Sequence, residues 1–155
     1  MYGDEARRTE KYRPGQGVQL PLGVLACVQQ QRIGDLAGCE VWGIDGEVVR
    51  NPSGIGDDEF EGGGNYARHL YIPRPQIWVE FCLPLDAWPP LILHEWVEQH
   101  AMTVMGIPYE QAHTICARLC ERVFRAGDKD RFKCASMQDV LALAAKELPT
   151  CLSMI

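Results

Sequence analysis

Glycine and proline divide the second half of the chain into three stretches with helical signals, and this division restricts the fold more than any other feature. We predict a first helix over about 89–105, which Gly106 ends, and a second over about 108–125, which Gly127 follows. A third helix is predicted over 136–149. The helices therefore come last in the chain, and the strands must come from the first half.

The predicted helix starts carry capping chemistry. Pro89 and Pro90 suit a first helical turn, because proline fixes φ near the helical value and the first turn needs no backbone donor. We expect Asp86 to cap this helix. Ser136, followed three residues later by Asp139, is a weaker form of the capping box that opens many helices.

Residues 39–50, with the sequence CEVWGIDGEVVR, have the pattern of a β-hairpin. Asp45 and Gly46 form a preferred two-residue turn, and apolar residues flank them on both sides. We therefore predict two antiparallel strands joined at this turn.

Two further segments complete the first half. Residues 51–66 are rich in glycine and acid and are predicted to form a long loop, and loops of this length are often functional. Residues 70–82 are predicted to form a strand. Pro73 and Pro75 place its start at a sheet edge, because proline cannot donate a hydrogen bond to a ladder.

These segments predict a small α+β protein, in which an antiparallel sheet from the first half packs against about three helices from the second. Residues 1–17 are polar and are expected to form a loose arm, and 18–155 a single domain. Residues 18–28 fit a strand or a short helix equally well.

Composition excludes several classes of partner. The formal net charge of -6 disfavours a nucleic-acid backbone. The polar start of the chain does not resemble a secretory leader, and no apolar span is long enough to cross a bilayer, so we expect no membrane association. Seven cysteines without a CxxC pair fit free thiols in a reducing compartment, which predicts a cytoplasmic protein.

The first predicted helix carries the motif HExxE, from His94 to Glu98. Residues four apart lie one turn apart on the same helix face. A metal ion needs donor atoms that converge from rigid elements, and imidazole nitrogen and carboxylate oxygen are both zinc ligands. His94 and Glu98 are therefore candidate metal ligands, and the alternative is an ion pair on the helix surface.

His113, in the second predicted helix, is the third candidate ligand. We expect it to share a packed stripe with Cys116 and Ala117. If this helix packs antiparallel to the first through the tight turn between them, His113 approaches His94 and Glu98. Two imidazoles and one carboxylate are the ligands of well-known catalytic zinc sites, and Fe(II) or Mn(II) accept the same donors.

Four neighbouring residues have open roles. Glu95 is either a catalytic base or an exposed helical acid. Glu110 or Glu121 could be a further ligand or could orient one. His69 follows the glycine run and is either an ordinary surface histidine or a loop contact over the site.

The sequence HEWVE followed by GIPYEQAH resembles short zincin-like metallopeptidases. It is more similar still to a family of phage and bacterial proteins with a DGE hairpin, an extended IPxxxIWV segment, an HExxE helix and a YxxAH helix. The corresponding pieces in this chain are Asp45 to Glu47, Ile72 to Val79, His94 to Glu98, and Tyr109 to His113. The resemblance covers the middle half of the chain. Glu98 departs from the HExxH peptidase pattern, in which a second histidine stands at this position.

The resemblance implies a zincin-like fold with a metal, zinc by default, at His94, Glu98 and His113. It implies a hydrolase of the peptidase type, in which Glu95 is the general base and the substrate is a peptide, a protein or another amide. Gln76–Glu80 would be the edge strand that holds an extended peptide. For a phage-encoded protein, the compartment would be the host cytoplasm. The alternative is a non-enzymatic accessory or interaction protein of the phage type, in which a metal only staples the two helices.

Overall fold

The computed structural model describes residues 20–125 and 133–155, so the arm predicted at 1–17 lies outside the described residues. The sheet contains β1 (Gln29–Leu36), β2 (Cys39–Ile44), β4 (Gln76–Glu80) and β3 (Gly63–Asn65), in that spatial order. The described helices are α2 (Leu22–Val28), α3 (Gly46–Arg50), α4 (Trp88–Thr103), α5 (Tyr109–Arg125) and α6 (Met137–Ser153), and a 3-10 turn, Leu85–Ala87, precedes α4. The predicted α+β class, with three long helices in the second half, is confirmed.

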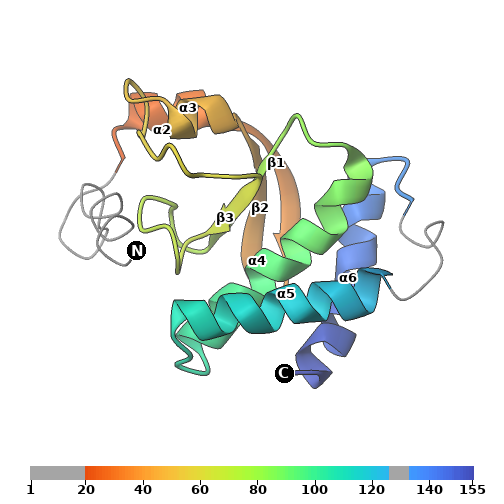
Figure 1. Cartoon of the computed structure of the whole chain (residues 1–155). Helices are drawn as coiled ribbons and strands as arrows, with labels where there is room; N and C mark the ends of the chain where they lie inside the picture. The colour runs from red at the N-terminus through yellow and green to blue at the C-terminus, as the bar shows by residue number, and fades with distance from the viewer. Residues whose placement is uncertain (1–19, 126–132) are drawn as a thin grey trace.

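Helices cover both faces of the sheet (Figure 1). The alternation of side chains along β4 separates two apolar clusters, because successive residues of a strand point to opposite faces. Ile77 and Val79 pack with residues of α4 and α6, whereas Trp78 packs on the other face with Val49 of α3 and with Phe60. α5 lies against α4 (Figure 1).

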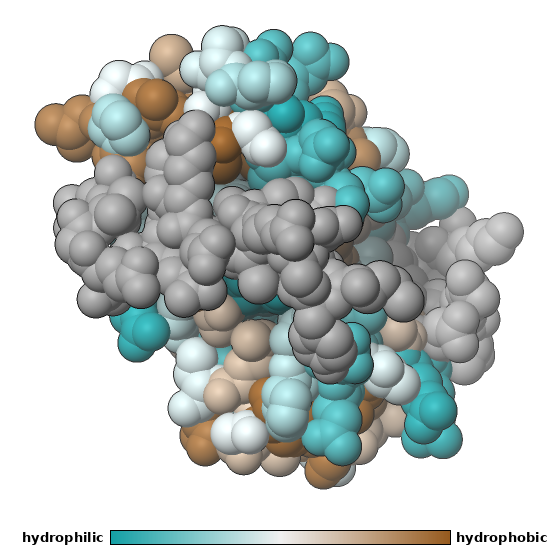
Figure 2. All heavy atoms as spheres, turned by 60° about the vertical axis from the view of Figure 1, so that its left-hand side comes forward, coloured by the Kyte–Doolittle hydropathy of each residue, from teal (hydrophilic) through white to brown (hydrophobic). Residues whose placement is uncertain are grey.

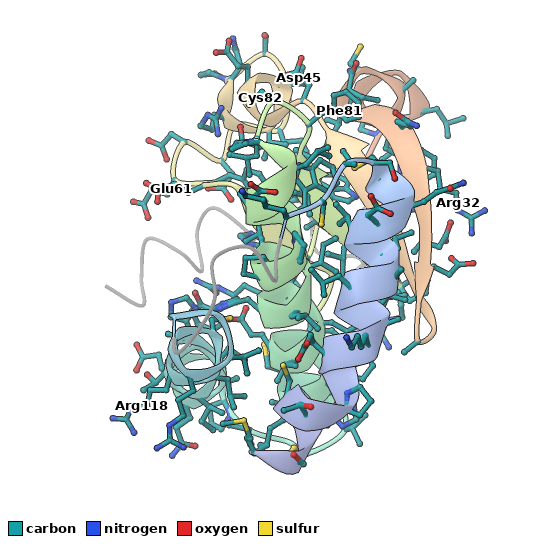
Figure 3. All side chains as sticks on the ribbon, turned by 90° about the vertical axis from the view of Figure 1, so that its right-hand side faces the viewer. Arg32, Asp45, Glu61, Phe81, Cys82 and Arg118 are labelled. Atoms are coloured by element: carbon teal, nitrogen blue, oxygen red, sulfur yellow. The ribbon has the colours of Figure 1, made fainter. Side chains whose placement is uncertain are left out.

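α4 is the central helix of the second half. Figure 3 shows α4 and α6 side by side, with the end of α5 on one side and β1 on the other. Ten of the 16 residues of α4 are buried, including Glu95 and Glu98. Because burial of a charged group is costly unless it is paired, these acids need partners from the elements around the helix.

The sheet is mixed rather than wholly antiparallel. β2 pairs with β1 in the antiparallel sense but with β4 in the parallel sense, and β4 pairs antiparallel with β3. The expected edge position of Gln76–Glu80 is therefore wrong, since β4 lies between two strands. The edge strand is β3, which forms inside the segment 51–66 that was predicted to be a loop.

The hairpin predicted at 39–50 is also wrong, because the chain enters α3 directly after β2. Asp45 caps this short helix: its Oδ1 accepts a hydrogen bond from the backbone N–H of Glu47 at 3.0 Å. An Asp-Gly pair suits a helix start as well as a hairpin turn, and long-range packing decides between the two.

That packing centres on the carboxylate of Glu80, at the end of β4. Its Oε1 lies 2.8 Å from Nη2 of Arg50, and its Oε2 accepts a hydrogen bond from the backbone N–H of Gly62 at 2.8 Å. Arg50 also donates from Nη1 to the carbonyl of Phe60 at 3.0 Å. Glu80 also packs directly against Gly46, where a Cβ atom would collide with the carboxylate. The ion pair of Glu80 and Arg50 thus fixes the loop before β3. The close approach of Glu80 also requires glycine at position 46.

The helix boundaries follow the predictions in part. Ser136 caps α6 by accepting a hydrogen bond from the N–H of Asp139, as predicted. Asp86 does not cap α4; its Oδ1 accepts from the N–H of Cys134 instead. α6 continues through Pro149 to its end four residues later, so the predicted stop at this proline is wrong.

Figure 2 shows hydrophobic residues at the end that carries α2 and α3 and again at the opposite end, with hydrophilic residues among them at both. Leu22 of α2, at 84% exposure, is the most exposed large apolar residue among those described. None of the described helices has the length and apolar character needed to cross a membrane.

We predict that Gly46→Ala lowers the free energy of unfolding by about 2 kcal/mol, because the added methyl group overpacks the Glu80 carboxylate. Urea unfolding of the full chain measures the change. The matched control is Gly23→Ala in α2, where nothing lies within 4 Å of the added Cβ. This control should leave stability unchanged or raise it by up to about 1 kcal/mol. Equal effects of the two substitutions would contradict the role given to Glu80.

Candidate metal centre

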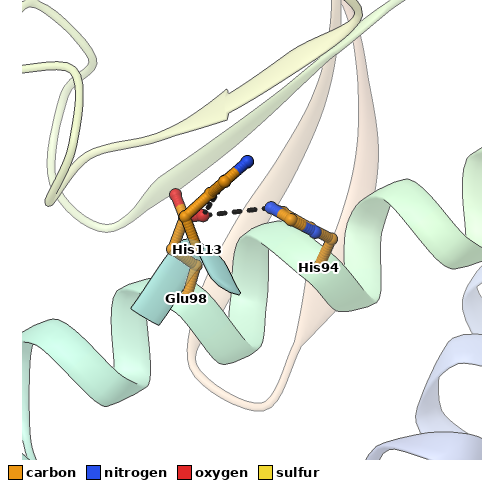
Figure 4. Close-up of side chains that lie close together, drawn as sticks. All are labelled: His94, Glu98 and His113. Atoms are coloured by element: carbon orange, nitrogen blue, oxygen red, sulfur yellow. Dashed lines mark hydrogen bonds and ion pairs between the residues drawn. The ribbon is translucent and has the colours of Figure 1, made fainter. Parts of the chain in front are cut away.

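His94, Glu98 and His113 come together where α5 crosses α4 (Figure 4). Nε2 of His94 and Nδ1 of His113 each lie 3.0 Å from the same oxygen, Oε2 of Glu98. The two imidazole rings are 5.0 Å apart between centroids and nearly perpendicular. The three side chains therefore offer two nitrogens and one oxygen to a common point, as the sequence predicted.

The antiparallel packing of α4 and α5 is confirmed. α4 ends at Thr103, and Gly106, with a φ of +69°, lies in the turn that follows, in the left-handed conformation that glycine adopts without strain. α5 then runs back along α4, so that His113 contacts Glu98 and, further along, the thiol of Cys120 contacts the carbonyl of Pro90. The tight turn after α4 thus sets which residues of the two helices meet.

The packed stripe of α5 differs from the prediction. Its buried residues include Ala112, Cys116 and Leu119, whereas Ala117 is exposed. His113 lies at the border of this stripe, and 52% of its side chain is exposed. Its ring therefore reaches Glu98 with one nitrogen and packs beside the rings of His94 and Tyr109, while about half of the side chain remains exposed.

Asn65 of β3, which the sequence analysis did not single out, donates hydrogen bonds to the two buried acids of α4, Glu95 and Glu98. Its Nδ2 donates to Oε2 of Glu95 at 2.8 Å and to Oε1 of Glu98 at 3.1 Å. Its Oδ1 accepts hydrogen bonds from the backbone N–H groups of Ala67 and Arg68, each at 3.0 Å. Asparagine in a turn is a common sequence signal, but nothing local indicates that its amide reaches a helix 30 residues away.

These contacts and the burial of the groups shift the pKa values of Glu98, His94 and Glu95. Burial opposes ionisation of Glu98, but hydrogen bonds and charges from His94 and His113 lower its pKa. Burial also opposes a charge on His94, yet contacts with the Cys120 thiol and with Glu98, together with the nearby acids, raise its pKa to about 10. The pKa of Glu95 is raised by burial and by the charge of Glu98. Without a metal, the group is thus a buried ion pair of Glu98 with His94.

The geometry fits a metal ion. All three ligand atoms lie within 4.8 Å of one another. Tetrahedral ligands about 2.1 Å from an ion are separated by about 3.4 Å, so the 3.0 Å nitrogen–oxygen distances need to widen by only a few tenths of an ångström. The donor set does not identify the metal, because zinc, iron(II) and manganese(II) all accept it.

The cluster borders a cleft of about 240 Å³. Glu95, Glu98 and His113 line it from the helices, and Gly63 and His69 line it from β3 and the segment that follows. His69 is therefore part of the cleft rather than an ordinary surface histidine. Other lining residues include Asp57, Glu59, Glu61, Arg68 and Tyr109. Figure 3 shows Glu61 pointing outward, away from α4.

Among the described side chains, the remaining candidate does not join the group. Glu110 is exposed and lies outside the three-residue cluster found among the described residues. The side chain of Glu121 lies outside the described residues. His100 stacks on the indole of Trp96 at 5.0 Å between ring centroids.

No family model, curated protein or solved structure matches the chain. The resemblance to zincin-like peptidases therefore has no support from a relative, and what is established is a His-Glu-His group that could bind a metal.

We predict that Asn65→Ala lowers the free energy of unfolding by about 3 kcal/mol, because it removes the donor shared by two buried carboxylates. Chemical denaturation of the metal-free protein measures this. Asn51→Ala is the matched control, since Asn51 also closes a turn through Oδ1 but its side chain is exposed. Its cost should be about 0.5–1 kcal/mol. A similar cost for both would mean that Asn65 acts only through its turn.

Proposed function

We propose that this protein is a divalent-metal-dependent hydrolase, with zinc as the first choice of metal and a peptide or other amide as substrate. One observation carries the proposal: the three candidate ligands converge, and two of them, Glu98 and His113, line a cleft that Glu95 also lines. Perturbed ionisable groups that gather in a cleft beside candidate metal ligands are the usual features of a catalytic site.

His94, Glu98 and His113 would hold the ion, leaving one tetrahedral position for water or substrate. A divalent ion bound there lowers the pKa of a coordinated water and polarises a carbonyl group. Asn65 orients Glu98 by bonding Oε1, so that Oε2 faces both histidines. Such outer hydrogen bonds fix the direction of a ligand and tune its basicity.

Two observations support Glu95 as the general base. Asn65 bonds its Oε2, and the side chain borders the cleft. Burial raises its pKa, which strengthens it as a proton acceptor for an attacking water. Glu95 would later return this proton to the leaving nitrogen, so that no net proton remains on the protein.

The substrate strand would lie along β3. This edge strand takes the role first expected of Gln76–Glu80, and its residue Gly63 lines the cleft. An extended peptide added to an edge strand binds through main-chain hydrogen bonds.

The alternative function, a metal that only staples α4 to α5, requires a closed coordination shell. Among the described residues, the cluster has three ligands. The sulfur of Cys120 lies 4.0 Å from Nδ1 of His94, whereas Glu98 contacts Nε2 of the same ring. Cys120 therefore lies on the far side of the imidazole from the metal position. This arrangement favours an open, catalytic site.

We predict that tag-free protein binds about one equivalent of zinc, iron(II) or manganese(II), as measured by elemental mass spectrometry and calorimetric titration. His113→Ala should lower the metal affinity by about 100-fold or more, and should abolish the rise in melting temperature on adding metal.

His100→Ala is the matched control, because His100 also lies on α4 but stacks on Trp96 outside the cluster. It should retain full metal uptake. Less than about a tenth of an equivalent in the wild-type chain, with no uptake on titration, would overturn the site.

We predict that Glu95→Gln retains the metal and the fold but slows hydrolysis by about 100-fold or more, because the amide cannot accept the proton. Mass spectrometry of a peptide library incubated with the zinc-loaded protein measures cleavage. Under the staple alternative, neither protein cleaves any peptide. Equal cleavage by the wild type and Glu95→Gln would remove Glu95 from the chemistry.

A further inference from the structure

His69 lines the same cleft as the metal cluster, but it comes from the segment after β3 rather than from the helices. The ring is held tightly. Its centroid lies 5.6 Å from that of Phe60 and 5.4 Å from that of Tyr71, and a Cβ atom on Gly64 would collide with its Cδ2. Only 20% of the side chain is exposed. The imidazole is therefore a fixed part of the cleft, and its two nitrogens have fixed directions.

The hydrogen bonds around His69 determine which nitrogen carries the hydrogen. Asp57, whose pKa is lowered despite burial by its bonds to His69 and Tyr71, is a carboxylate and can only accept. The hydroxyl of Tyr71 therefore donates to Oδ2 of Asp57, at 2.8 Å. Its oxygen must then accept from Nδ1 of His69, at 3.2 Å, and the same Asp57 oxygen lies 3.6 Å from this Nδ1.

His69 thus donates a hydrogen bond to Tyr71, and Tyr71 donates one to Asp57. In the neutral form of the imidazole, the hydrogen is therefore on Nδ1 and the lone pair is on Nε2. Nε2 makes no hydrogen bond to any described residue, and it is the remaining polar atom of a ring that borders the cleft. The cleft therefore contains a rigid hydrogen-bond acceptor that the hydrolytic machinery does not use.

Building on the proposed hydrolase function, we propose that His69 is a substrate-binding residue whose Nε2 accepts a hydrogen bond from the N–H of a peptide bond. A secondary amide held at the metal cluster presents such an N–H group beside the reacting carbonyl, whereas an ester or an N-methylated amide does not. A site built around a fixed acceptor rejects a ligand that leaves this acceptor unpaired. The substrates are thus secondary amides, that is, peptides rather than esters.

Two hydroxamates test this on the zinc-loaded full chain. Acetohydroxamate carries an N–H next to the carbonyl that binds zinc, and N-methylacetohydroxamate carries a methyl group in its place; both bind zinc through their carbonyl and hydroxamate oxygens. In calorimetry, the wild type should prefer the N–H compound by about tenfold, and His69→Phe should lower this preference to about one. Acetate, which has no N–H, should bind both proteins within about twofold of each other.

Tyr71→Phe is the second variant, because it keeps the ring and removes only the hydroxyl that fixes His69. It should weaken the preference without changing zinc uptake. Nitrogen-15 NMR at about pH 8, above the ordinary imidazole pKa, should show His69 with its hydrogen on Nδ1 in the wild type. A hydrogen on Nε2, equal affinities for the two hydroxamates, or a preference that survives His69→Phe would overturn the inference. Failure of the wild type to bind zinc would overturn the proposed function and this inference with it.

Discussion

Two carboxylates three residues apart on a buried helix dominate the structure, because neither can be ionised inside the protein without donors brought from elsewhere. Glu95 and Glu98 of α4 receive those donors from two directions. Asn65 reaches both from the edge strand, and His94 and His113 reach Glu98 from the helices. Removing Asn65 takes a donor from both acids, and removing His113 takes one of the three donors from Glu98, so the positions of β3 and α5 are tied to α4 by electrostatics as well as by apolar packing.

The position of Asn65 depends on another carboxylate, that of Glu80. Glu80 at the end of β4 binds Arg50 and the backbone of Gly62, and so closes the acidic loop before β3. β3 contains only three residues, and its pairing with β4 alone would fix it weakly. The loop is therefore anchored a few residues before the position at which its asparagine must meet α4. The three candidate metal ligands lie on helices, whereas the facing wall of the cleft comes from this anchored loop.

The sequence predicted those parts of the site that depend on helix geometry. His94 and Glu98 are four residues apart, and the turn at Gly106 brings His113 to them, so spacing and one turn were enough. The prediction from sequence failed where contacts between residues far apart in the chain determine the local structure. Asp45 and Gly46 suit a hairpin and a helix start alike, and only the packing of Glu80 on Gly46 selects the helix. The same long-range contacts create β3 within a glycine-rich loop and place Gln76–Glu80 inside the sheet.

A glutamate, rather than a histidine, at position 98 fits the same network. The carboxylate of Glu98 accepts on two oxygens: Oε2 faces both histidines, and Oε1 faces the amide of Asn65. A histidine at this position that used one nitrogen to bind a metal would carry its hydrogen on the other nitrogen. That N–H would meet the N–H of Asn65, donor against donor, at two positions that are both buried. The glutamate at position 98 and the asparagine at position 65 therefore complement each other, and a carboxylate in place of the second histidine of an HExxH pattern matches the donor that β3 supplies.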